Sequence, residues 1–157
     1  MPSNMRFMNP DAIAKPGGYT HVVEITGPGR VVYIAGQLGV KPDGKIAGDF
    51  RAQAVQVYRN LNAALAAVGA TFKDVVKINS YLADIKDLPV LRDVRAGYLN
   101  AAALPASTTL GNLTFAREGA LLEVEVVAVL PAKAASAKAG AKRGTLKAKV
   151  KARRKGR

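Results

Sequence analysis

The chain has 157 residues, about the length of one globular domain, and 49% of them are hydrophobic, enough for a single buried core. It contains no cysteine and one histidine, His21, which excludes disulfides, thiolate chemistry and cysteine-ligated metals and argues against a zinc site or a Ser-His-Asp triad. The net charge of +13 is unevenly placed, since residues 1–130 hold 13 basic and 11 acidic residues whereas residues 131–157 hold 11 basic and no acidic ones.

The charge distribution separates a basic tail from the rest of the chain, and three parts are expected in all. We expect an N-terminal extension over residues 1–15, one folded domain over 16–130 and a basic disordered tail over 131–157. The first twenty residues contain no apolar run of the kind a secretory signal needs. The longest apolar run, from Leu121 to Leu130, is too short to span a membrane and includes two glutamates. We therefore expect a cytoplasmic protein without a membrane partner.

Two strands and a helix are predicted in the first half of the domain. Residues 20–25 and 30–38 are rich in β-branched side chains and flank the turn residues 27–29, which predicts a β-hairpin. Asp49 then supplies a helix N-cap and Gly69 a C-terminal stop. Apolar residues recur at helical spacing between them, from Phe50 to Val68, so this segment is predicted to be a helix.

The second half of the domain is also predicted to contain strands and a helix. Residues 74–82 read as a strand, Leu88-Pro89 begins a second helix, and residues 107–113 and 121–130 read as two further strands. The order ββαβαββ predicts an α+β fold in which a mixed sheet carries both helices on one face. The other face then needs a cover, and an oligomer is the simplest one.

The last strand carries the clearest chemical signal. Its period of two places Glu123 and Glu125 on one face of the sheet and only apolar residues on the other. If a neighbouring subunit covers the face with the carboxylates, they become partly desolvated and suited to moving protons. The alternative is an edge strand that faces solvent and carries solubilising glutamates.

Five short motifs carry a family resemblance. They are Gly18-Tyr19, Ile34-Ala-Gly-Gln37, Val75-Val-Lys77, Leu104-Pro-Ala106 and the glutamate strand 123–129. Together with the order of elements, they make residues 16–130 resemble the RidA (YjgF/UK-type) family of imine and enamine deaminases, also described as endoribonuclease L-PSP or translation inhibitor. The resemblance implies a chorismate-mutase-like α/β sandwich and a homotrimer whose small-molecule clefts lie between subunits. We expect no metal and no cofactor.

The resemblance also implies a set of site residues. The glutamate at the position of Glu123 activates water in the family, the tyrosine at Tyr19 lines the cleft, and the glycine at Gly36 lies beside the ligand. Its neighbours Ala35 and Gln37 complete the substrate-binding turn, although Ala35 replaces a family serine.

One departure from the family pattern bears on the substrate. Deaminating members typically carry an arginine at the position of Ser107 that binds the substrate carboxylate, and a cysteine at the position of Thr109. A hydroxyl cannot replace the bidentate, charge-assisted contact of a guanidinium. A neutral or differently charged ligand therefore fits better than 2-iminopropanoate. Arg92, Arg95 and Arg117 are candidates for a replacement arginine, and the alternative is that all three are surface charges.

Three functions follow as hypotheses. The first is a C=N hydrolase of the deaminase type, with Glu123 as the catalytic residue and Tyr19, Ser107 and Thr109 shaping the pocket. The second is a small-metabolite binding protein of the same fold without turnover. The third is weak, non-specific nucleic-acid or RNA binding through the basic residues 131–157, driven by counterion release.

Overall fold

A computed structural model describes residues 4–132, so the predicted tail lies outside the described residues beyond Ala132. Within residues 4–132, no helix has the length and apolar character needed to cross a membrane. The single-turn 3-10 helices Phe72–Asp74 and Ile85–Asp87 precede the third predicted strand and the second helix. The main elements are β1 (Met5–Met8), β2 (Val22–Ile25), β3 (Gly29–Leu38), α1 (Phe50–Ala67), β4 (Val75–Leu82), α2 (Leu88–Ala96), β5 (Ala106–Leu110) and β6 (Leu122–Pro131).

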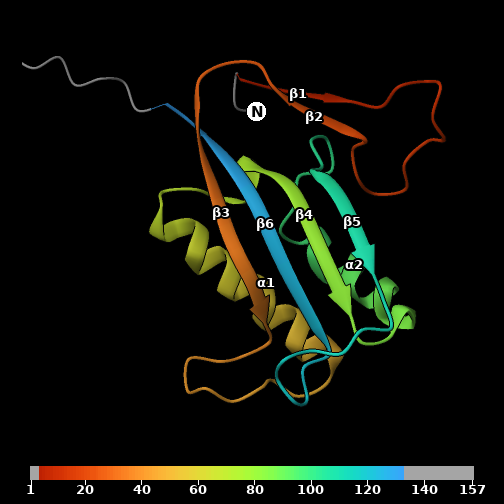
Figure 1. The fold of residues 1–157 in the computed structure, drawn as a ribbon, viewed down its shortest axis with the longest axis vertical. Coiled ribbons are helices and arrows are strands. Elements are labelled where there is room, and N and C mark those ends of the chain that lie inside the picture. The colour runs from red at the N-terminus through yellow and green to blue at the C-terminus, as the bar shows by residue number, and fades with distance from the viewer. Residues whose placement is uncertain (1–3, 133–157) are drawn as a thin grey trace, which may run out of the picture.

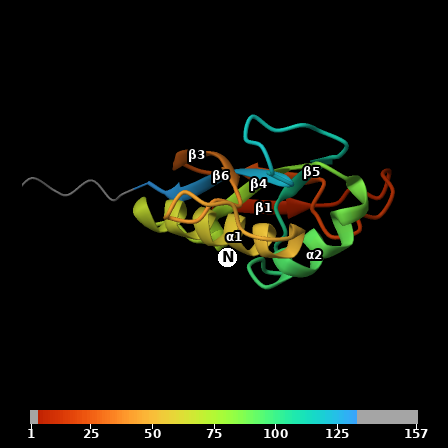
Figure 2. The same ribbon diagram turned by 90° about the horizontal axis from the view of Figure 1, so that it is seen from below.

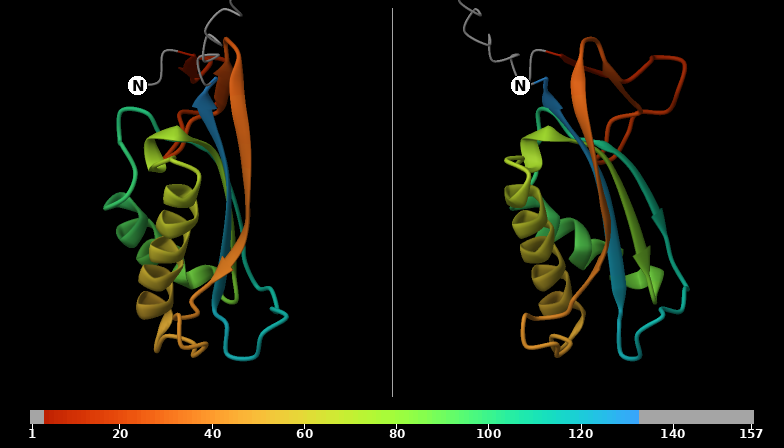
Figure 3. Two further views of the ribbon diagram at one scale, coloured as in Figure 1. Left: turned by 90° about the vertical axis from the view of Figure 1, so that its left-hand side faces the viewer. Right: turned by 60° about the vertical axis from the view of Figure 1, so that its left-hand side comes forward.

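The main sheet has four strands in the order β3-β6-β4-β5 (Figure 1). Strand β6 runs antiparallel to both of its neighbours, whereas β4 and β5 are parallel and are joined through α2. Both helices cover one face of this sheet and leave the other face free of helices (Figures 2 and 3). The predicted mixed sheet with two helices on one face is therefore confirmed.

Helix α1 shows why this layer is stable. The Asp49 side chain accepts a hydrogen bond from the backbone N–H of Ala52 at 2.8 Å, and the helix ends before Gly69, whose φ of +75° suits glycine. The apolar side chains of α1 meet those of the sheet in a single core. From β6, the core receives Leu122, Val124, Val126, Ala128 and Leu130.

The predicted hairpin is wrong in its pairing. Strand β2 pairs antiparallel with β1, with Met5 opposite Ile25, and the two form a separate two-stranded sheet. Strand β3 instead pairs with β6. The two strands approach closely at the start of β3, since a Cβ at Gly29 would stand only 2.8 Å from Cγ1 of Val129. Residues 26–28 thus carry the chain from one sheet to the other. Strand β1 lies within residues 1–15, which the sequence assigned to an extension, and supplies the partner that β2 needs.

Candidate functional site

The two glutamates of β6 lie in the middle of the sheet. Because β6 is flanked by β3 and β4, the alternative that these glutamates decorate an edge strand is wrong. Glu123 and Glu125 are both half-buried and alternate with core residues, so they lie on the face without helices.

Glu125 is held by β4. Its Oε1 atom accepts a hydrogen bond from Nδ2 of Asn79 at 2.7 Å and another from the Tyr81 hydroxyl at 3.0 Å. The hydrogen bond to Glu125 is the main cause that raises the pKa of Tyr81. With its position fixed in this way, Glu125 lines a surface cavity of about 460 Å³ together with residues of β3, β4 and β6.

Glu123 faces a bulge in β3. The register between β3 and β6 shifts between Ile34 and Gln37, so that two residues, Ala35 and Gly36, stand where one would pair. The Gln37 side chain folds back on this bulge and donates from Nε2 to the carbonyl oxygen of Ala35 at 3.1 Å. A Cβ at Gly36 would stand 2.6 Å from Cδ of Glu123. Four of the predicted site residues therefore lie together in one chain, namely Ala35, Gly36, Gln37 and Glu123.

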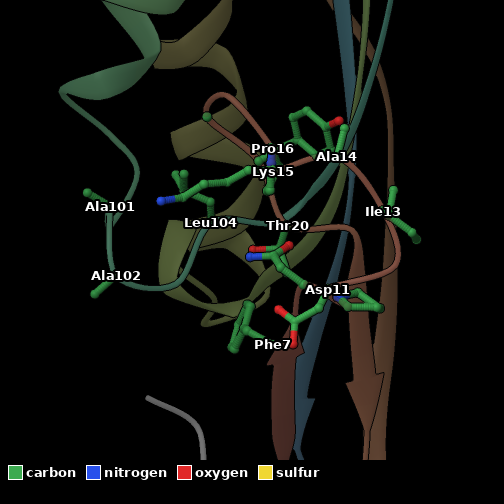
Figure 4. A pocket seen from close by; sticks show the side chains of 14 residues that line it. Phe7, Asp11, Ile13, Ala14, Lys15, Pro16, Thr20, Ala101, Ala102 and Leu104 are labelled. Atoms are coloured by element: carbon green, nitrogen blue, oxygen red, sulfur yellow. The ribbon is translucent and has the colours of Figure 1, made fainter.

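Tyr19 lies in the loop between β1 and β2, where it lines a pocket of about 830 Å³. Its ring packs edge-on against His21, with ring centroids 5.2 Å apart. The backbone N–H of Thr20 donates to the carbonyl oxygen of Pro105 at 3.2 Å, which ties this loop to the start of β5. Ala101, Ala102 and Leu104, which come from the segment between α2 and β5, complete the lining of this pocket (Figure 4).

Ser107 and Thr109 lie apart from Glu123 in a single chain. In the parallel pairing of β5 with β4, they stand opposite Ile78 and Ser80, which are buried on the helix side. Thr108, between them, accepts a hydrogen bond from Nζ of Lys77 at 2.7 Å on the other side. Ser107 and Thr109 therefore point toward the helix side of the sheet, whereas Glu123 points away from it.

Of the three candidate arginines, Arg95 is not a surface charge. Only 6% of its surface is exposed, and its Nη2 atom donates to the carbonyl oxygen of Gly18 at 2.8 Å. Burial is the main cause that lowers the pKa of Arg95, while the nearby Tyr58 acts to raise it and repulsion from Arg92 acts to lower it. Arg92 is exposed but lines the same cavity as Arg95, whereas Arg117 is exposed and donates to the Gly44 carbonyl oxygen.

The sequence contains a signal that could have singled out Arg95. It follows Leu91 by four residues and Val94 by one, so it occupies the buried face of α2 at helical spacing. A charged residue at an apolar position of this kind indicates either a structural contact or a binding site.

Comparisons with known proteins agree with these motifs. A family model described as Endoribonuclease L-PSP matches residues 9–130, which include every predicted site residue. The chain is 32% identical over 122 residues to a RutC family protein of Aquifex aeolicus, covering 76% of this chain and 94% of that protein. It is 31% identical over 116 residues to the 2-iminobutanoate/2-iminopropanoate deaminase of Dermatophagoides farinae, covering 73% and 87%.

Solved structures show the same fold. The Rid family protein YyfB from Yersinia pestis matches with a TM-score of 0.71 and 32% identity, over 81% of this chain and 99% of that one. RidA from an Antarctic Psychrobacter matches with a TM-score of 0.61 and 33% identity, over 79% and 98%. Because the family model covers most of the chain and these relatives share more than 30% identity with it, the chain belongs to the Endoribonuclease L-PSP family, which is the RidA/YjgF family that its motifs resemble.

Proposed function

We propose that this protein hydrolyses the C=N bond of a small imine, or of an enamine through its imine form, with Glu123 activating the water. The observation that carries the proposal is the packing of the half-buried Glu123 side chain against Gly36 at the β3 bulge. The family membership supports it, since relatives such as the mouse protein, 32% identical over 120 residues, are named 2-iminobutanoate/2-iminopropanoate deaminase.

The reaction needs one group that can accept and return a proton. Glu123 takes a proton from water as the water oxygen attacks the imine carbon, and it returns this proton to the nitrogen, which gives a carbinolamine. Glu123 then takes the hydroxyl proton and passes it to the amino group, so that the C–N bond breaks, ammonia leaves and a carbonyl forms. One imine and one water thus give one carbonyl compound and one ammonia, and no oxidant or cofactor is consumed.

A neighbouring subunit completes the site in this proposal. Ser107 and Thr109 point away from Glu123 within one chain, so a pocket that uses all three needs residues from two chains. The helix-free face exposes Tyr33 by 81% and Val31 by 51%, and it is this face that a homotrimer would cover. Light scattering during size-exclusion chromatography tests this, and a monomer at micromolar concentration would contradict it.

The expected substrates lack the carboxylate of 2-iminopropanoate beside the imine carbon. Ser107 offers a neutral hydrogen bond where a guanidinium would offer two charge-assisted ones, each worth about 1.5–3 kcal/mol. We therefore expect a preference for neutral imines over 2-imino acids of the same size.

The test is ammonia release from imines produced in the assay itself. An amino-acid oxidase supplies 2-imino acids and an amine oxidase supplies neutral imines, and the full chain should accelerate hydrolysis of at least one of them. Glu123→Gln should lower the catalysed rate by about 100-fold or more. Glu118→Gln, which removes the same charge from an exposed turn, should leave the rate unchanged. Full activity in Glu123→Gln would overturn the role of this residue.

The second candidate function is binding without turnover. It is favoured by Ser107, because a serine hydroxyl cannot make the charge-assisted contact with which an arginine orients a substrate. Native mass spectrometry of the purified oligomer should then reveal a bound metabolite, and that metabolite should raise the melting temperature without product. An empty oligomer that no metabolite stabilises would count against this function.

Nucleic-acid binding through residues 131–157 stays a prediction from the sequence, since residues from 133 onward lie outside the described part of the chain. It predicts RNA binding that falls steeply with salt and that is lost when these residues are removed. RNA binding that survives the truncation would contradict it.

A further inference from the structure

Arg95 is a buried charge with few partners. A guanidinium carries five N–H donors, yet the one hydrogen bond that Arg95 makes within residues 4–132 is the one to the Gly18 carbonyl oxygen. No carboxylate in that part of the chain forms an ion pair with it. No nitrogen of Arg95 is among the fully buried side-chain atoms without a partner in residues 4–132, so its remaining donors are open to the cavity that Arg95 lines. An anion in this cavity would gain charge-assisted hydrogen bonds from them.

A second guanidinium faces the same space. Arg92 and Arg95 line one cavity of about 210 Å³, and Arg92 is close enough for its charge to disfavour the charged form of Arg95. Asp93, the acidic residue between them on α2, is engaged elsewhere, because its carboxylate accepts a hydrogen bond from Arg51 at 2.7 Å. The two arginines therefore form a positive pair that the described residues leave without a counter-charge.

The remaining walls of this cavity are apolar or backbone. Gly17 and Gly18 form one side, and Gly18 has a φ of +106°, a conformation that suits glycine and from which its carbonyl meets Arg95. The other walls are small or aliphatic side chains, namely Ala96, Leu99, Ala101 and Leu104. The cavity therefore has a cationic end and an aliphatic end. Its volume suits a molecule of a few carbon atoms.

We propose that the cavity lined by Arg92 and Arg95 binds a small aliphatic monocarboxylate, whose oxygens accept hydrogen bonds from the two guanidinium groups. Its alkyl chain lies among the leucine and alanine side chains. The site shares Gly18, Ala101 and Leu104 with the pocket of Tyr19, so a bound carboxylate also contacts residues that form that pocket. This proposal is independent of the hydrolase proposal, because it concerns binding and uses neither Glu123 nor Ser107.

The experiment titrates the full chain with butanoate and measures binding by calorimetry, with butanamide as the neutral ligand of the same shape. Butanoate should bind saturably, and butanamide should bind at least 10-fold more weakly, since one charge-assisted contact is worth about 10- to 100-fold in affinity. Two-dimensional NMR should show shifts of the backbone amides of Gly17, Gly18 and Leu99 during the titration. No saturable binding, or equal binding of butanamide, would overturn the proposal.

Variants locate the site. Arg92→Gln changes an exposed residue and should weaken butanoate binding by about 10-fold or more without altering the melting temperature. Arg59→Gln removes the same charge from the exposed surface of α1 and should leave binding unchanged. Arg95→Gln should abolish binding, with circular dichroism to confirm its fold. Butanoate affinity unchanged in Arg92→Gln and in folded Arg95→Gln, or equally tight binding of chloride, would contradict an aliphatic carboxylate site here.

Discussion

Gly36 approaches Glu123 so closely that a Cβ at this position would stand 2.6 Å from Cδ and 2.8 Å from Cγ of the glutamate. The Gly36→Ala variant must therefore displace the Glu123 side chain, which can rotate, and the bulge itself stays in place. We expect the free energy of unfolding to fall by no more than about 1 kcal/mol, whereas hydrolysis should fall by about 100-fold because the carboxylate is misplaced.

The matched control for this variant is Gly48→Ala. A Cβ at Gly48 would find its nearest neighbour, Cβ of Ala52, at 4.0 Å, which is ordinary contact. This control should keep full activity. A Gly36→Ala protein as active as the control would show that the packing of Glu123 against the bulge does not serve catalysis.

Gly39 makes a different kind of contact. A Cβ there would stand 2.7 Å from Cα of Gln53, so the obstacle is the backbone of α1 and not the end of a flexible side chain. Gly39→Ala should therefore lower the free energy of unfolding by about 1–3 kcal/mol. Urea unfolding followed by circular dichroism measures this, and a loss below about 0.5 kcal/mol would contradict the close approach of α1 to this turn.

Gln53 links α1 to the segment before β6. Its buried amide donates from Nε2 to the carbonyl oxygen of Gly119 at 2.9 Å, and its Oε1 accepts from the backbone N–H of Leu121 at 2.9 Å. Gln53→Leu leaves both backbone groups without a partner and should cost about 1–3 kcal/mol of stability in urea unfolding. Gln56→Leu, on the same helix, loses a single bond to Asn60 and should cost less.

Tyr58 lies in the core against Phe72 and Tyr98, and its hydroxyl has no hydrogen-bond partner within the described residues. Burial raises the pKa of Tyr58 well above the ordinary value of 10.0, so the folded protein keeps the proton longer than the unfolded chain does. The stability that this shift contributes is complete below pH 10 and is lost as the pH rises toward the pKa of the folded state.

The Tyr58→Phe variant removes both the unpaired buried hydroxyl and the group whose pKa is raised on folding. At pH 7 its stability should equal or slightly exceed that of the unmodified protein, because an unpaired buried hydroxyl is removed. Above pH 10 the free energy of unfolding of the variant should fall less steeply with pH than that of the unmodified protein. The two slopes should differ by up to about 1.4 kcal/mol per pH unit. Urea unfolding at pH 7, 10 and 11 checks both points, and parallel curves above pH 10 would show that Tyr58 does not titrate with unfolding.

Much of the fold could be predicted from local pattern. Asp49 and Gly69 bracket α1 because capping depends on a few neighbouring residues, and the alternation in β6 gives its core face for the same reason. The pairing of β2 could not be predicted in this way. Residues 27–29 look like a hairpin turn, but a strand takes the partner that buries its side chains best, and for β3 that partner is β6, about a hundred residues later.

The site residues likewise include some that could be predicted from the sequence and some that could not. The resemblance placed Glu123 and Gly36 near the ligand, and the structure brings these two together through the bulge. The direction of Ser107 depends on its register against Ile78, which no motif contains. The burial of Arg95 depends on Gly17 and Gly18 folding over α2 from a distant part of the chain. Helical spacing with Leu91 indicates that Arg95 lies on the buried face of α2, but its partner at Gly18 is set by tertiary packing.

The β1–β2 sheet and its loop have a consequence for how this protein can change. Most of the pocket that contains Tyr19 is lined by residues 7–20, none of which belongs to the core cluster that holds the helices on the main sheet. Substitutions and insertions in residues 9–16 alter the shape of the pocket while the core cluster and the bonds that Gly18 and Thr20 make with the rest of the domain stay intact. Ligand preference and thermal stability can therefore evolve, or be engineered, separately in this chain.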